Sequence, residues 1–333
     1  MAHIITTQEL KQFTEVYQPS INYLGDELLP NETYANIKFA WEVLKGNDLL
    51  PVMAEVSALD AEAPIRSRYD AKRFEESVLY IKHKINLTEH QSRVKNYGVG
   101  SDQIKQLIFN DVNNLYRGVR ARVEAMKMEL FATGKITIQE NNVNHVIDYG
   151  LDAANIFAID LTNPDADVFE LVQKVKDFAR SKGKNVNSAI VSSRVLNLLK
   201  KNRVLQEARK NSSIVVDPSE GAFMTWLRSA LELSFAVNDE QYQYEKADGT
   251  KALARFFPDD RITFLSYNGN KLGETAFAPT PEDEMLDEAY KIDGLATVTE
   301  WTEKDPAAQW TKVSTSALPI VADMDNIYIC YTM

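Results

Sequence analysis

The chain has little of several residue types on which catalytic and metal sites depend. Its 333 residues include 1 cysteine, 4 histidines and 13 glycines. The single thiol, Cys330, cannot form an internal disulfide or a cysteine-based metal site, and its apolar surroundings predict a packed strand residue. The glycines form no phosphate-binding loop, and no serine-nucleophile elbow is present. The histidines lack the spacing usual for metal ligands; they are His3, His83, His90 and His145.

Positive charge and long apolar runs are also scarce. The 37 Lys and Arg residues are outnumbered by 48 Asp and Glu, which gives a formal net charge of −11. That balance argues against a protein that coats nucleic acid through its overall field, although it leaves room for a local basic patch. No apolar run approaches the roughly 18 residues of a membrane-spanning helix. The start of the chain has no signal-peptide pattern, so we expect a soluble protein made in a reducing, intracellular compartment.

One short stretch is basic against this acidic background. Residues 63–77 read APIRSRYDAKRFEES and lie between two strand-like segments, 51–59 and 78–87, which we expect to pair as a long hairpin. The candidate contact residues of its tip are Arg66, Arg68, Tyr69, Lys72, Arg73 and Phe74. Three interpretations are open: a nucleic-acid contact helped by the aromatic rings, a specific contact with an acidic protein surface, or a solvated loop. Acidic neighbours such as Asp70, Glu75 and Glu76 largely cancel the charge, which favours the protein contact.

The strongest local pattern predicts one long helix over residues 101–133. Apolar residues recur there at steps of three and four, which places them on one face of a helix. Ser101 or Asp102 can cap its start, and Gly134 stands where a glycine commonly ends a helix. We expect this face to be buried; it consists of Ile104, Ile108, Val112, Leu115, Val119, Val123, Met126 and Leu130.

The remaining segments predict further helices and strands, which together give an α+β chain. A short helix is expected at 7–17, a hairpin at 135–150, and an alternation of helices and strands after Pro164. Residues 279–290 are interpreted as an acidic, solvated loop, and the segment from 295 onward is rich in strand patterns.

Three segments resemble the major capsid proteins of tailed phages in the lambda E family. They are TTQELKQF near the start, NETYANIKFAWEVLKGNDLLPVMAEVSALDAEAPIRSRYDAKRFEESVLYIKHKINL, and WTKVSTSALPIVADMDNIYICYT at the end. The similarity is strong at both ends, weaker across the α/β insertion, and follows the whole chain in order.

The resemblance implies the Hong Kong 97-type capsid fold, an α+β fold. Its parts would be an N-terminal arm at 1–50, an extended β-hairpin loop at 51–90, a peripheral domain at 91–160 and 281–333 with helix 101–133 as its spine, and an α/β axial domain at 161–280. It further implies a non-enzymatic subunit, with no cofactor, no metal and no membrane, that assembles as hexamers and pentamers into an icosahedral shell around double-stranded DNA. Scaffolding, portal and decoration proteins would be its other partners, the virion its location, and the host bacterial cytoplasm its place of assembly.

Two other functions stay open at this point. The same fold could build a bacterial cargo compartment of the encapsulin type. A different class would be a metal-dependent hydrolase that uses acidic residues such as Asp259, Asp323 and Asp325, because paired carboxylates can bind a divalent cation.

Overall fold

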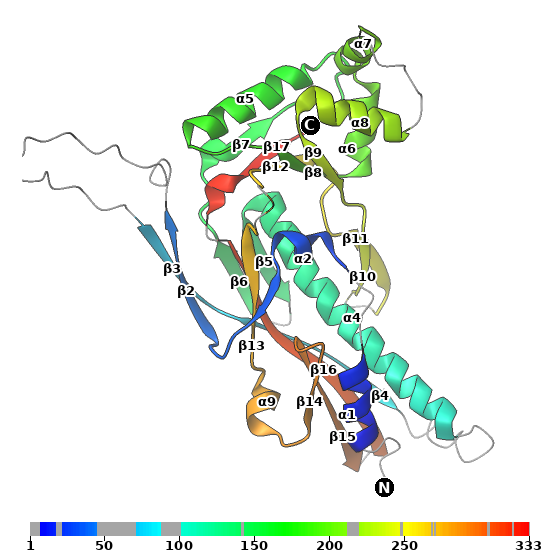
Figure 1. Cartoon of the computed structure of the whole chain (residues 1–333). Helices are drawn as coiled ribbons and strands as arrows, with labels where there is room; N and C mark the ends of the chain where they lie inside the picture. The colour runs from blue at the N-terminus through cyan, green and yellow to red at the C-terminus, as the bar shows by residue number, and fades with distance from the viewer. Residues whose placement is uncertain are drawn as a thin grey trace, which may run out of the picture. The chain divides into compact units, whose positions relative to one another are not determined.

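The computed structural model describes residues 7–17, 22–44, 71–87, 101–140, 143–211, 220–246, 249–267, 269, 271–304, 307–321 and 323–332. The chain forms two compact units. The first comprises Met1–Phe39, Glu75–Lys127 and Glu274–Ile320, and the second Ala40–Phe74, Met128–Gly273 and Val321–Met333. Helix α4 spans Ser101–Thr133, so the helix predicted over 101–133 is confirmed (Figure 1).

The first unit is built on a six-stranded sheet. Its order is β1 (Asn31–Thr33), β13 (Gly273–Ala278), β16 (Ala307–Val321), β15 (Ala296–Lys304) and β14 (Ala289–Ile292), and β4 (Leu79–Leu87) pairs antiparallel with β16. One face packs against α4 and α1 (Thr7–Val16). That core contains Leu10, Ile108, Val112, Tyr116, Val119, Ile292, Ala296, Val298 and Val313.

The predicted apolar stripe of α4 is largely buried. Ile108, Val112, Val119, Val123, Met126 and Leu130 are inaccessible to solvent or nearly so. Leu115 is half-buried, and the side chain of Ile104 lies outside the described residues. The helix ends at Gly134, whose positive φ of 73° and N–H donating to the carbonyl of Leu130 are those of a helix-ending glycine.

The second unit contains a five-stranded sheet in the order β7 (Ile156–Ala158), β17 (Ile327–Tyr331), β12 (Arg261–Leu265), β8 (Ser188–Val191) and β9 (Ser234–Val237). Helices α5 (Val168–Ser181), α6 (Ser193–Lys201) and α8 (Glu220–Leu231) pack on one face through a common apolar core. On the other face, the hydroxyl of Thr263 donates to the carbonyl of Phe131 at 2.9 Å, which fixes the last turn of α4 to β12.

Smaller elements complete the second unit. The hairpin predicted at 135–150 is confirmed as β5 (Lys135–Glu140) and β6 (Val143–Asp148), and β10 (Gln241–Glu245) pairs with β11 (Lys251–Arg255) as a second hairpin. Within the alternation of helices and strands expected after Pro164, residues 193–211 form two helices, α6 and α7 (Arg203–Asn211). Asn202 causes the break, because its backbone is extended and its side chain accepts from the N–H of Leu205.

Two strand assignments differ from those predicted from the sequence. Residues 71–77, expected in the loop tip, form strand β3 (Ala71–Ser77), which pairs with β2 (Lys38–Leu44), whereas β4 pairs with β16. Segment 51–59, expected to pair with 78–87, lies outside the described residues. The closing strands, which the resemblance assigns to one domain, are shared between two sheets, with β15 and β16 in the first unit's sheet and β17 in the second's. Strand partners depend on residues distant in the chain, so alternation within one segment does not specify them.

Candidate functional site

The structure describes three of the six residues predicted at the loop tip. Lys72, Arg73 and Phe74 lie on β3, where the side chain of Arg73 is exposed and that of Phe74 half-buried. Arg66, Arg68 and Tyr69 fall outside the described residues. The contact role of this group therefore stays a prediction.

Strand β4, which follows β3, contributes to a second basic surface that was not predicted from the sequence. In the antiparallel register, Lys84 of β4 lies opposite Lys312 of β16. Trp310, also on β16, lies opposite Trp301 of β15, the strand on the other side of β16. The two indole rings stack with centroids 6.1 Å apart and planes 12° apart, and the Lys84 ammonium lies 4.1 Å from the centroid of the Trp310 ring. We call this surface, with the neighbouring Lys82, the lysine–tryptophan face. It is the sheet face opposite to the core, because Val298 and Val313 alternate with these residues and point toward α4.

The acidic segment at 279–290 is not a solvated loop throughout. It contains a short helix, α9 (Pro281–Met285), which Thr280 and Asp283 begin with a reciprocal capping box. Glu282 is buried and accepts hydrogen bonds from Lys312, Tyr80 and, at 3.0 Å, the hydroxyl of Ser314. Burial alone would raise the pKa of Glu282, but the hydrogen bonds from Lys312 and Tyr80 outweigh it and lower the pKa to about 2.

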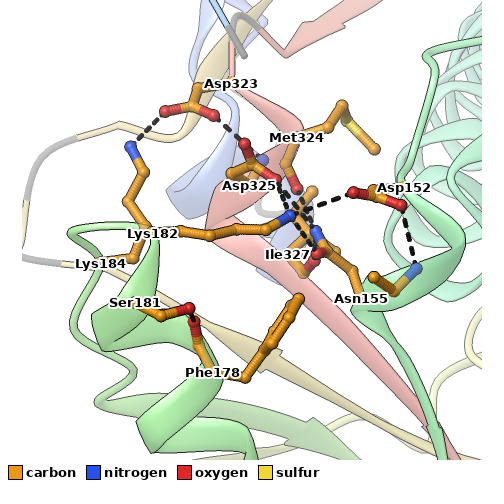
Figure 2. Close-up of polar contacts among 11 residues, drawn as sticks. Asp152, Asn155, Phe178, Ser181, Lys182, Lys184, Asp323, Met324, Asp325 and Ile327 are labelled. Atoms are coloured by element: carbon orange, nitrogen blue, oxygen red, sulfur yellow. Dashed lines mark hydrogen bonds and ion pairs between the residues drawn. The ribbon is translucent and has the colours of Figure 1, made fainter. Parts of the chain in front are cut away.

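A cluster of charged side chains fixes the turn before the last strand (Figure 2). The carboxylate of Asp323 caps the short helix Met324–Asn326 by accepting from the N–H of Asp325 at 3.0 Å. Lys182, at the end of α5, donates to Asp325 at 2.7 Å and to the side-chain oxygen of Asn155 at 2.8 Å, and Lys184 pairs with Asp323. The turn belongs to the ADMD stretch that carries part of the family resemblance. Its carboxylates anchor the terminal strand to α5.

Three aspartates named as hydrolase candidates therefore have cationic side-chain partners. Asp323 and Asp325 pair with lysines as described, and Asp259 lies 3.2 Å from the guanidinium of Arg255. Within the ranges that the structure describes, no group of three or more His, Cys, Asp or Glu side chains is arranged to hold a metal ion. These three aspartates form ion pairs with basic side chains.

The Lys182 cluster predicts a measurable contribution to stability. Lys182→Ala should lower the free energy of unfolding by about 2 kcal/mol, because the largely buried Asp325 carboxylate would lose its cation. Lys174→Ala on the same helix is the matched control, since its ion pair with Glu170 is exposed and should contribute less than about 0.5 kcal/mol. Urea unfolding of both variants measures the difference, and equal effects would contradict the anchoring role.

A further charged cluster attaches the N-terminal segment to α4 within the first unit. Asp26, on α2 (Leu24–Leu28), accepts from Arg120 at 2.6 Å and from Lys127 at 2.7 Å. The N–H of Gly25 donates to Glu124 at 3.0 Å, and a Cβ at position 25 would lie 2.3 Å from the same carboxylate. A side chain at position 25 would therefore displace the Glu124 carboxylate that the N–H of Gly25 binds.

The only cysteine is confirmed as a packed strand residue. Cys330 is buried on β17, and burial raises the pKa of its thiol to about 12, so the thiolate required of a nucleophile is not formed at neutral pH. Among the described helices, none has both the length and the apolar composition needed to cross a bilayer.

Comparison with known proteins identifies the family. The family model of phage major capsid protein E matches residues 6–330. The chain is similar to the solved structure of a putative capsid protein from a prophage of E. coli CFT073, with a TM-score of 0.63, 17% sequence identity and 99% of both chains covered. It is also similar to a phage-related protein of Bordetella bronchiseptica RB50, with a TM-score of 0.55, 15% identity, and coverage of 97% of this chain and 95% of that one. None of the curated proteins matches the chain.

At these identities the structural likeness shows a common capsid fold, and the family model covers almost the entire sequence in agreement with it. The chain therefore belongs to the phage major capsid protein E family.

Proposed function

We propose that this chain is the subunit of a phage head, of which many copies assemble as hexamers and pentamers into an icosahedral shell around double-stranded DNA. The observation that carries the proposal is the family match over residues 6–330, together with a fold like that of a prophage capsid protein. The shell would be assembled in the host cytoplasm with scaffolding, portal and decoration proteins. The division into arm, extended loop, peripheral domain and axial domain that the resemblance implies is part of this proposal.

Assembly by this chain would depend on repeated contacts between identical surfaces. Heterologous contacts close into a ring or shell when the angle between neighbouring subunits allows it. The net charge of −11 is compatible with enclosing DNA without binding it tightly, because the overall field repels phosphate. The basic loop tip would then meet an acidic surface of a neighbouring copy, where charge fixes partner and register.

Electron microscopy of the expressed chain tests the proposal. Negative staining should show uniform shells, tubes, or rings of five and six subunits, either alone or with proteins from neighbouring genes. A chain that stays strictly monomeric at high concentration under all these conditions would contradict the shell function.

A charge reversal tests the loop tip separately. Changing Arg66, Arg68, Lys72 and Arg73 to glutamate should leave the monomer folded and raise the concentration required for assembly by at least about tenfold, through loss of attraction and added repulsion. Reversal of four exposed lysines elsewhere, Lys174, Lys201, Lys246 and Lys251, changes the net charge equally and is the matched control. If both variants assemble like the unmodified chain, the tip is not an interface.

A further inference from the structure

The lysine–tryptophan face is an amphipathic surface on which Lys312 is paired with Glu282, whereas Lys82 and Lys84 form no ion pair within the described residues. Lys82 and Lys84 are exposed, and Trp301 keeps 36% of its surface accessible. In the described part of the chain, no carboxylate forms an ion pair with either lysine; their ammonium groups lie over the rings of Tyr80 and of the tryptophans. A stacked pair of indoles beside two such cations is suited to a partner that is both acidic and apolar.

The end of α9 has the complementary composition. Met285 is 79% and Leu286 50% exposed, and the exposed acids Glu284, Asp287 and Glu288 flank them. We call residues 284–288 the acidic turn.

The acidic turn is held in a defined position within the first unit. The capping box at Thr280 begins α9, and the N–H of Leu286 donates to the carbonyl of Glu282 at 3.0 Å. Glu282 itself is anchored to Lys312 and Tyr80 of the sheet. Because the turn is fixed from within, presenting its apolar pair to a partner costs little conformational entropy.

We propose that the lysine–tryptophan face of one copy binds the acidic turn of a second copy, an inference that rests on the shell function proposed above. Met285 and Leu286 would pack on the stacked indoles, with the methionine sulfur against an aromatic ring. The flanking carboxylates would pair with Lys82 and Lys84. Each copy carries both surfaces, so the contact can close as a reciprocal pair or continue from copy to copy around a ring.

A nucleic acid fits the face less well than the acidic turn does. Lysines and aromatic rings are also found where single strands bind. However, the indole N–H of Trp310 donates to the Glu303 carboxylate at 2.8 Å, so one side of the stacked rings is already acidic. Glu282 and Asp283 add negative charge beside Lys312 and Lys291. The phosphates of a nucleic acid would be repelled both by Glu303 and by the Glu282–Asp283 pair, whereas a short acidic turn can be positioned between these two acidic sites.

Charge exchange tests the contact directly. The first variant carries Lys82→Glu and Lys84→Glu, the second Glu284→Lys and Asp287→Lys, and the third all four changes. All the residues are exposed, so we expect each variant to fold like the unmodified chain, as circular dichroism and thermal unfolding will verify. Light scattering should show the assembly threshold raised at least about tenfold in each double variant. In the fourfold variant it should return to within about threefold of the original value, because the exchanged charges attract again.

Several outcomes would overturn the inference. Double variants that assemble like the unmodified chain would exclude this face as an interface, and a fourfold variant worse than either double variant would exclude this pairing. The variant carrying Glu284→Lys and Asp287→Lys can also be combined with the loop-tip reversal. If that combination restores assembly and the fourfold variant does not, the acidic turn contacts the loop tip instead. Loss of binding to a single-stranded oligonucleotide with unchanged assembly would assign the face to nucleic acid. Failure of the unmodified chain to assemble counts against the shell function itself, so the two failures are distinguishable.

Discussion

Val119→Asp is expected to lower the free energy of unfolding by about 4 kcal/mol or more and to leave little folded protein at 37 °C. Val119 is 1% exposed and packs in the core between α4, α1 and the first unit's sheet. The new carboxylate would have no cationic partner in that core, so it must either be buried charged or take up a proton, and both are costly. Val123→Asp, one turn further along α4, should have a similar effect, because Val123 is equally buried.

The comparison that isolates burial uses the same helix. Asn110→Asp also places an aspartate on α4, but Asn110 is exposed, so its free energy of unfolding should change by less than about 0.5 kcal/mol. Thermal and urea unfolding of the three proteins measures the effects. Retained thermal stability in Val119→Asp would show that the apolar stripe of α4 is not a core surface.

The spine helix could be predicted because its information is local. One apolar residue every three or four positions specifies both the helix and its buried face, and Gly134 marks its end. The hairpin at β5–β6 was predictable for the same reason, since the alternating residues of both strands lie within 16 residues of the chain, 135–150.

The features that could not be predicted depend on distant partners. In the sequence, Glu282 is one of several acids in a segment expected to be solvated. Its hydrogen-bond donors, Lys312 of β16 and Tyr80 of β4, lie far from it in the chain. The lysine–tryptophan face needs three strands in register, and Lys84 and Trp301 are more than 200 residues apart in the chain. The prediction placed all of residues 63–77 in the charged tip, whereas Ala71–Ser77 form strand β3, which pairs with β2. The sequence of β2 gives no indication of this pairing.

Asp26→Asn is expected to lower the free energy of unfolding at pH 7 by about 3 kcal/mol. Asp26 is 21% exposed on its side chain and is the carboxylate between Arg120 and the fully buried Lys127. The amide keeps the shape of the side chain but removes the charge, which leaves two buried cations with less compensation. Glu15→Gln is the matched control; its ion pair with Lys11 is long and exposed, so the change should be within about 0.5 kcal/mol.

The effect of Asp26→Asn should also depend on pH with a defined sign. Burial alone would raise the pKa of Asp26, but Lys127 and Arg120 outweigh it, so the folded-state pKa lies below the usual value of about 4. The ionised carboxylate therefore stabilises the fold fully above pH about 4, and this contribution is lost as the pH falls through the lowered folded-state pKa. The difference between the unmodified chain and Asp26→Asn should be constant from pH 7 to pH 5 and shrink below pH about 4. Urea unfolding across this range measures it, and a difference that persists unchanged to the lowest pH would mean that the charge of Asp26 does not hold α2 against α4.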